Sequence, residues 1–365
     1  MLRDKNNIVL SNIGILSFSL IFALLVGSGL YGYGVDYYAA YHKPNFSQGI
    51  TFAQAGFEGK LTFDFIGYRV ATLTIFETHI GVHITTFLLS LSVGLLIREN
   101  LRLKLNYSLA FFTLLYLIVI HTWPIIMSTS NAMRQGLSMS FIFLALISSS
   151  NKNYVWLVIF ILVSIFMHKS GLLLSMIILF ATYVNNLLRS VSFKRRRVIH
   201  FLFGTLLLIT FYAAISYNYD TSEGSKIIEG DFRAAFVLIS FSYVILSFVH
   251  KNLINGPYNL TLYYYSFMSP AILMNGLNWE FERLGMMMLI PYILAIGIIF
   301  DRTLNKFYLI IVFLALLLLT IYMGMYDFGL NQSPPLSMHI QQGGYGLIWN
   351  GEAWIMDIDY KGMYD

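Results

Sequence analysis

The sequence contains no cysteine and few charged residues. Without cysteine the chain forms no disulfide, and thiol nucleophiles and cysteine-based metal sites are excluded. Asp, Glu, Lys and Arg make up 11% of the residues, whereas ordinary soluble domains carry about 25%. Walker and Rossmann glycine patterns are also absent, so nothing supports a soluble nucleotide donor. Together these absences argue against a soluble enzyme.

Apolar residues make up 57% of the chain and occur in long runs. The runs are about 17–22 residues long, which is the length that crosses a bilayer. The first run, Ile13–Leu30, follows Arg3 and Lys5 as a signal peptide would. It lacks a small-x-small cleavage site and further spans follow it, so we interpret it as a retained first helix. The composition therefore predicts an all-α polytopic integral membrane protein.

We expect about eleven transmembrane helices. They cover residues 11–30, 68–97, 107–127, 132–149, 153–167, 170–188, 197–216, 233–250, 259–275, 284–300 and 306–324. The second is expected to enter obliquely or to break near Thr78–His79. The segment 259–275 is short and polar, and a re-entrant segment is the alternative there. We therefore expect a transmembrane domain over 1–324, with outer loops 31–67, 217–232 and 276–283, and an extracytoplasmic aromatic tail over 325–365.

Positive charge is distributed unequally between the two sets of loops. One set, with the N-terminus, holds fourteen of the 23 Lys and Arg but three of the 18 Asp and Glu. The positive-inside rule then places the N-terminus in the cytoplasm and the C-terminus outside. An odd number of spans requires the same arrangement. Because the cytoplasmic loops are short and the outer segments are long, the chemistry is expected at the outer face.

Cations recur where helices begin at the outer face. The sequence predicts one near each inward-running N-terminus: Arg69, Arg134, Lys169, Arg233 and Arg283. Snorkelling to lipid phosphate explains any one of them. As a group they are not expected from the positive-inside rule, which favours cations on the cytoplasmic side. They also lie at helix N-termini, whose N–H groups and dipoles already favour anions. Arginine recognises phosphate through two parallel hydrogen bonds. We therefore predict a phosphate or diphosphate site.

Acids and aromatic residues share the outer side. Asp36 lies in "YGYGVDYYAAYHKPN" and Glu282 in "NGLNWEFERLGMM". Either carboxylate suits a general base acting on a sugar hydroxyl, with loop solvation as the alternative. Tyr37 and Tyr41 suit stacking on sugar rings, with an interfacial aromatic belt as the alternative. His168 in "FMHKSGLLL" is a candidate for orienting phosphate or moving a proton, or a hydrogen-bonded structural group. No cofactor and no metal are expected.

Three stretches resemble the EpsG/Wzy-type membrane polymerases. In "NAMRQGLSMSFIFLALISSSNKNYVWLVIFILVSIFMHKSGLLL", Arg-Gln at a helix start, a Lys-containing turn and Phe-x-His-x-Ser match the family pattern. "YGVDYYAAY" resembles its Gly-x-Asp-Tyr segment, and "WEFERLGMMM" its late Glu-Arg segment. The matching residues are Arg134, Gln135, Lys152, Phe166, His168, Ser170, Gly34, Asp36, Tyr37, Tyr41, Glu282 and Arg283. "FDFIGYRV" departs from the Glu-Pro-Gly-Tyr-like residues that the family often has.

The resemblance implies a GT-C-like bundle and an O-antigen or exopolysaccharide polymerase. Such enzymes transfer an undecaprenyl-diphosphate-linked glycan onto another lipid-linked repeat unit at the outer face of the bacterial inner membrane. Expected partners are the lipid-linked donor and acceptor, membrane lipids and a chain-length regulator protein, without nucleic acid. Arg134, Arg283, Arg233, Lys169 and Arg69 are the expected diphosphate ligands, and Tyr37, Tyr41 and Gln135 the glycan-binding residues.

Other functions stay open on the sequence alone. A lipid-linked oligosaccharide flippase also binds diphosphate lipids through arginines, but usually lines its path with charges inside the spans. The mid-span stretches here hold almost no charge. A ligase would bring a larger late outer domain than 217–232. An acyltransferase would be centred on a histidine, for which His168 is the candidate.

Overall fold

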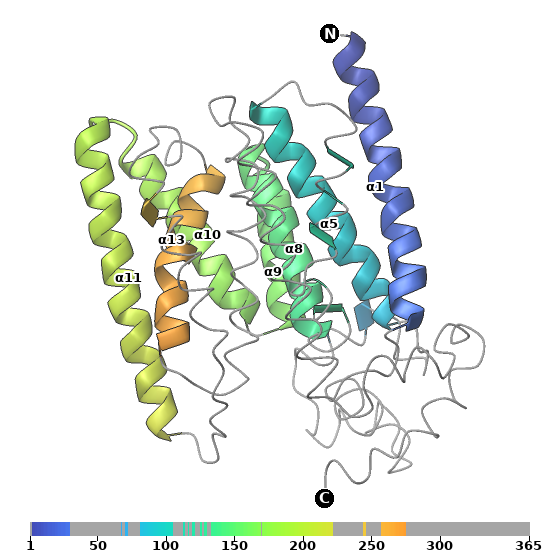
Figure 1. Cartoon of the computed structure of the whole chain (residues 1–365). Coiled ribbons are helices and arrows are strands. Elements are labelled where there is room, and N and C mark those ends of the chain that lie inside the picture. Colours follow the sequence, from blue (N-terminus) through green and yellow to red (C-terminus); the bar gives the residue numbers. More distant parts are fainter. Residues whose placement is uncertain are drawn as a thin grey trace, which may run out of the picture.

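The computed structural model describes residues 2–29, 67, 70–71, 81–104, 112–113, 116, 119–120, 125, 128–129, 133–168, 170–221, 244–245 and 257–274. Throughout this part of the chain the secondary structure is helical, with turns only at 151–153, 168 and 188–192. Its long helices are α1 (Leu2–Gly29), α5 (Gly81–Lys104), α8 (Met133–Ser150), α9 (Tyr154–Met167), α10 (Ser170–Leu187), α11 (Phe193–Thr221) and α13 (Pro257–Met274). Figure 1 shows them side by side in one bundle. The expected all-α architecture is confirmed for these residues.

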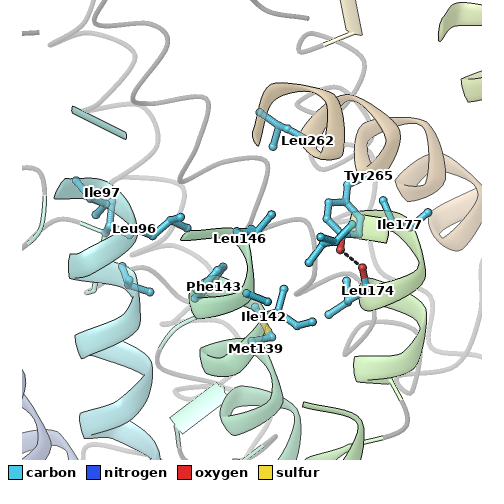
Figure 2. Close-up of a cluster of buried hydrophobic side chains, with 14 of the residues drawn as sticks. Leu96, Ile97, Met139, Ile142, Phe143, Leu146, Leu174, Ile177, Leu262 and Tyr265 are labelled. Atoms are coloured by element: carbon cyan, nitrogen blue, oxygen red, sulfur yellow. Dashed lines mark hydrogen bonds between the residues drawn. The ribbon is translucent and has the colours of Figure 1, made fainter. Parts of the chain in front are cut away.

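Helix α8 lies at the centre of this bundle. Thirteen of its 18 residues are buried, and it packs against α5, α9, α10 and α13. Met139, Ile142 and Phe143 lie in the buried cluster that α8 shares with its neighbours (Figure 2). The hydroxyl of Tyr265 donates a hydrogen bond to the carbonyl oxygen of Leu174 at 2.7 Å, which joins α13 to α10 beside this cluster. A helix surrounded by protein needs no lipid-facing stripe, which is why α8 tolerates many serines.

Helices α8 and α9 form an antiparallel hairpin closed by a tight turn. The N–H of Asn153 donates to Ser148 O at 2.9 Å, and the N–H of Lys152 donates to Ser149 O at 3.1 Å. This pair of bonds is the Schellman motif, which places one residue in the left-handed conformation after a helix. Lys152 takes that position with φ of 55°. The turn is therefore closed by a residue with a Cβ where glycine is usual.

Helices α11 and α13 run parallel to each other. His200 contacts Tyr264, and further along both helices Phe201 and Gly204 contact Phe267. Residues 222–256 lie between these two helices in the sequence. In that interval the structure describes residues 244–245, which are helical, with Val244 buried. The segment predicted at 259–275 is an 18-residue helix, Pro257–Met274.

Hydrogen bonds join α1 to α5 through a tyrosine. Tyr116 OH donates to Ser90 O at 3.1 Å, so the Ser19 hydroxyl, 2.7 Å away, donates to the tyrosine oxygen. Gly94 packs against Ile15, and Arg98 donates to the side-chain oxygen of Asn12. From the first of these contacts to the last, the residue numbers fall along α1 and rise along α5. The two helices are therefore antiparallel.

Several helices extend beyond the predicted spans. Helix α1 begins at Leu2 rather than 11, α5 ends at Lys104 rather than 97, and α11 covers Phe193–Thr221 rather than 197–216. Basic residues that the sequence placed in loops therefore lie in helical turns, Arg102 in α5 and Lys194–Arg197 in α11. The first part of the predicted loop 217–232 is helical as well. The predictions followed the apolar core, whereas a helix continues into the polar zones outside it.

The boundaries of the central helices were predicted more closely. Those of 132–149, 153–167, 170–188 and 259–275 agree with α8, α9, α10 and α13 within two residues. Within the second predicted span, 68–97, the structure describes helix at 70–71 and from Gly81, so the break near Thr78–His79 lies outside the described residues. The same holds for 284–300, 306–324 and the tail 325–365.

The bundle presents apolar side chains on its outer surface. Two described helical segments are long and apolar enough to cross a bilayer, Ser170–Leu187 and Phe193–Ala214, and two shorter ones are Leu10–Leu24 and Tyr154–Met167. Val155 on α9 is 70% exposed, and Leu202 on α11 is 61% exposed. Rows of large exposed apolar residues on α1, α9 and α11 exceed what a water-soluble surface carries. Lipid is the medium that fits them.

Candidate functional site

Arg134 lies at one end of the central helix. It is the second residue of α8 and is partly buried, between the buried Met133 and Gln135. Because α8 is enclosed by α5, α9, α10 and α13, its end lies within the bundle rather than at the lipid-facing perimeter. This placement favours a site over the alternative in which Arg134 only reaches toward lipid headgroups.

The start of α8 is fixed by a backbone contact. A Cβ built on Gly136 would lie 2.0 Å from the carbonyl oxygen of Ser128, closer than any side chain permits. Ser128 and Thr129 are helical and buried. The glycine therefore lets the backbone at Ser128 lie directly against the first turns of α8, two residues from Arg134.

A reciprocal serine pair sets the register of α8 and α9. Ser138 Oγ donates to Ser164 O at 3.0 Å, and Ser164 Oγ donates to Ser138 O at 3.0 Å. Arg134 is one turn before Ser138, and His168 is one turn after Ser164. In an antiparallel pair these two residues consequently lie at the same level and at the same end of the bundle. The structure thus places two of the predicted site residues at one level, one on each side of the hairpin.

His168 links the end of α9 to the beginning of α10. Its backbone is extended, with φ −163° and ψ 141°, and its N–H still donates to Ser164 O at 3.2 Å. Its ring Nδ1 lies 3.2 Å from the backbone N–H of Ser170 and 2.7 Å from Ser170 Oγ. A backbone N–H can only donate, so Nδ1 is the acceptor and the ring proton lies on Nε2. The imidazole is therefore an N-terminal cap for α10 with its ring proton on Nε2.

Close packing also positions the start of α10. A Cβ on Gly171 would meet the carbonyl oxygen and the hydroxyl of Ser164, both at 2.5 Å. A Cβ on Gly67 would lie 2.3 Å from the carbonyl oxygen of Phe166. Between membrane helices, small residues allow backbones to approach and interhelical hydrogen bonds add about 0.6 kcal/mol each on average. Ser164 is the point where α8, α9 and α10 meet.

The arrangement suits an anion. Helices α8 and α10 both begin at this end of the bundle, so two positive dipole ends and their N–H groups face the same membrane surface. Arg134 adds a guanidinium, and His168 adds an N–H donor at the same level. A guanidinium, a donor imidazole and helix amides stabilise phosphate oxygens and the negative charge that develops on a departing phosphate.

Eight of the eleven predicted site residues lie outside the described residues. They are Asp36, Glu282, Arg283, Arg233, Lys169, Arg69, Tyr37 and Tyr41. Gln135, the third described candidate, is 2% exposed and lies inside the bundle. Its glycan contact stays a prediction, and it requires the sugar to reach between the helices. No group of three or more His, Asp or Glu with metal-binding geometry occurs among the residues that the structure describes.

The sequence reasoning missed the residues that hold Arg134 and His168 in place. No role was predicted for the four small residues there, because a small residue in an apolar run does not itself indicate a packing contact. They are Gly136, Ser138, Ser164 and Gly171. One signal was available, since Arg134 and His168 are equally far from the turn at Asn151. In a hairpin of two straight helices, equal distances from the turn imply equal depth.

Comparison with known proteins gives one match. The model of the EpsG family matches residues 9–333. No curated protein and no solved structure matches the chain. The family match covers most of the chain and includes all the described helices except the first residues of α1. The protein therefore belongs to the EpsG family, membrane proteins of the exopolysaccharide-polymerase type.

Proposed function

We propose that this protein is an O-antigen or exopolysaccharide polymerase of the bacterial inner membrane. It transfers a glycan from undecaprenyl diphosphate onto the end of another lipid-linked repeat unit at the periplasmic face. The N-terminus lies in the cytoplasm and the C-terminus in the periplasm, with about eleven spans in a GT-C-like bundle. The transmembrane domain covers 1–324, and the tail 325–365 is extracytoplasmic. Family membership and the anion-binding arrangement at the start of α8 and α10 support this proposal.

The observation that carries the proposal is the shared level of Arg134 and His168. The Ser138–Ser164 pair sets it, and both residues lie where helices begin. A polymerase must hold a diphosphate while the bond to the sugar breaks. A cation and an N–H donor that lie at one level near the centre of the bundle can hold the diphosphate between them. They do so better than cations spread over the perimeter.

In the proposed reaction a hydroxyl of the acceptor glycan attacks the anomeric carbon of the donor glycan. A carbon–oxygen bond forms there while the bond from the anomeric carbon to the diphosphate oxygen breaks. The electron pair goes to undecaprenyl diphosphate, which Arg134, Arg283, Arg233, Lys169 and Arg69 stabilise. The hydroxyl proton goes to Asp36 or Glu282. His168 donates from Nε2 to the diphosphate or to that carboxylate.

Glycan and protein contacts complete the proposal. Tyr37 and Tyr41 stack on sugar rings, and Gln135 hydrogen-bonds the glycan. The side-chain cations supply the positive charge, so the reaction is metal-independent and needs no cofactor. A chain-length regulator protein is the expected protein partner, and membrane lipids surround the bundle.

A reconstituted assay tests the proposal. Purified protein in proteoliposomes is supplied with undecaprenyl-diphosphate-linked repeat units, and products are separated by length. A polymerase lengthens the glycan, whereas a flippase moves the repeat unit across the bilayer without lengthening it. Arg134→Ala is expected to remove lengthening, while Arg189→Ala, an exposed cation at the opposite end of the bundle, retains it. Transport without lengthening by the unmodified protein contradicts the proposal.

A further inference from the structure

Ser170 donates from its hydroxyl to the imidazole of His168. Ser170 Oγ lies 2.7 Å from His168 Nδ1, and the backbone nitrogen of Ser170 lies 3.2 Å from the same atom. Because a backbone N–H only donates, Nδ1 is the acceptor and carries no proton. A hydroxyl oxygen 2.7 Å from an acceptor nitrogen must then supply the proton between them. The two residues are therefore joined by two hydrogen bonds that end on one ring nitrogen.

The hydroxyl bond is the shorter of these two. A distance of 2.7 Å is usual for a hydroxyl donor, whereas 3.2 Å is at the long end of the range for a backbone N–H. In a neutral imidazole, the bond made by one ring nitrogen decides which of the two nitrogens carries the proton. The Ser170 hydroxyl is therefore the main determinant of the tautomer in which His168 carries its proton on Nε2.

Packing of α10 against α9 holds the backbone that carries this hydroxyl. The next residue, Gly171, lies so close to Ser164 that an added Cβ would be 2.5 Å from both its carbonyl oxygen and its hydroxyl. The N–H of Gly171 also donates to the carbonyl oxygen of His168 at 2.8 Å. Backbone and side-chain bonds thus close the same short turn. The position of the Ser170 backbone relative to the imidazole is therefore fixed.

Burial excludes a nucleophilic role for this serine. A serine hydroxyl bonded to a histidine also occurs in covalent catalysis, where the imidazole takes the hydroxyl proton. That role requires the serine oxygen to reach the substrate, whereas Ser170 is 4% exposed and its hydroxyl is directed at the ring. The ring nitrogen that it contacts also caps α10. Ser170 therefore acts on the reaction through His168.

We propose that Ser170 is a positioning residue for glycan transfer, whose hydroxyl fixes the tautomer and the ring orientation of His168. The ring proton then lies on Nε2, from which His168 donates in the proposed reaction. The expected effect on rate rests on the proposed polymerase function. The tautomer is a property of the protein without substrate, so it is measured independently of that function.

Ser175 on the same helix provides a matched control. It is 1% exposed, and within the described part of the chain its hydroxyl has no hydrogen-bond partner. Ser170→Ala and Ser175→Ala therefore remove the same atom from two buried positions of α10, but only the first change removes a bond to His168. A melting temperature for each variant shows that it folds.

Nitrogen-15 NMR of protein labelled in its histidine rings measures the tautomer. The signals of His168 are identified by their absence from the spectrum of His168→Asn. In the unmodified protein and in Ser175→Ala we expect a protonated Nε2 and an Nδ1 that accepts hydrogen bonds. In Ser170→Ala the Nδ1 signal is expected to move toward that of a nitrogen without a donor, because only the long backbone bond is left.

Rates in the reconstituted lengthening assay complete the experiment. Ser170→Ala is expected to lower kcat about three- to tenfold with little change in KM, the effect of losing one hydrogen bond, and Ser175→Ala to leave both unchanged. An unmoved Nδ1 signal in Ser170→Ala overturns the inference, and so does a moved signal with an unchanged kcat. Failure of the unmodified protein to lengthen glycan contradicts instead the polymerase function, and the positioning role with it.

Discussion

Ser138 and Ser164 exchange hydrogen bonds in both directions. Each hydroxyl donates to the carbonyl oxygen of the other residue at 3.0 Å, and the two hydroxyl oxygens are 2.8 Å apart. A slip of one residue along either helix breaks all three contacts. The pair therefore fixes the relative depth of α8 and α9, and with it the depth of Arg134 relative to His168.

The first prediction concerns Arg134 itself. Arg134→Ala is expected to keep membrane insertion and to lower the rate of glycan lengthening about 10²–10³-fold, the usual effect of removing one preorganised stabilising group. Arg134→Lys is expected to restore little activity, because an ammonium cannot make two parallel hydrogen bonds to phosphate. Chain length and rate in the reconstituted assay are the measurements. Normal chain length in the Ala variant removes Arg134 from the mechanism, and full activity of the Lys variant assigns it a generic electrostatic role.

The second prediction separates the two roles of His168. The Nδ1 atom caps α10, so His168→Ala is expected to lower the unfolding free energy by about 1 kcal/mol. His168→Asn supplies a side-chain oxygen that also accepts the Ser170 N–H, so its stability is expected to be near that of the unmodified protein. Both variants lose the Nε2–H donor and are expected to lose activity. Thermal unfolding in detergent and the lengthening assay measure the two effects.

Each outcome for His168 has a distinct meaning. An Asn variant with normal stability and normal activity shows that the histidine is only a helix cap. An Ala variant as stable as the unmodified protein shows instead that the cap contributes nothing, and the tautomer deduced from it then loses its support.

The helices of the central hairpin were predictable from the sequence for a physical reason. Between residues 132 and 188 the apolar runs are interrupted only by short polar turns, at Asn151–Asn153 and at His168. A turn between membrane helices must lie outside the hydrocarbon, so it marks where one helix ends and the next begins. Lys194–Arg197 show the opposite case. Four consecutive charged residues predict a loop, although α11 has already begun at Phe193.

The candidate site was predictable only in part. Arg134 and His168 stand out because a cation and an imidazole are rare near hydrocarbon. Their alignment depends on Ser138 and Ser164, whose hydroxyls resemble those of any other serine in a helix until the partner helix is placed. The close backbone contact at Gly136 could not be predicted for the same reason. The packing role of a glycine can be recognised only when the segment that it contacts is known.

The third prediction concerns divalent metal. The proposed mechanism uses Arg134 and other side-chain cations to stabilise the leaving diphosphate, so treatment with EDTA is expected to leave the lengthening rate unchanged. The assay is run on protein and lipid substrate that have both been passed through chelating resin. Loss of activity in EDTA that Mg²⁺ or Mn²⁺ restores contradicts the metal-independent mechanism.

The fourth prediction concerns the turn at Lys152. Its φ of 55° is a conformation that costs a residue with a Cβ roughly 1–2 kcal/mol. Lys152→Gly is expected to raise the unfolding free energy by about 1 kcal/mol, after allowance for the greater freedom of glycine in the unfolded chain. Lys152→Ala removes the same charge without relieving the backbone and serves as the control. If the Gly variant melts no higher than the Ala variant, the turn is not strained.

The fifth prediction concerns the contact that seats α8 against the preceding segment. A Cβ at Gly136 would lie 2.0 Å from Ser128 O, a backbone atom that cannot swing aside. Gly136→Ala is therefore expected to displace the start of α8, to lower the unfolding free energy by about 1–3 kcal/mol, and to reduce lengthening by moving Arg134. Gly14→Ala is the matched control, because nothing lies within 4 Å of a Cβ there, and it is expected to leave melting temperature and activity unchanged. Equal behaviour of the two variants, followed by thermal unfolding and by product length, would mean that α8 is not seated by this backbone contact and that Arg134 is positioned by the Ser138–Ser164 pair alone.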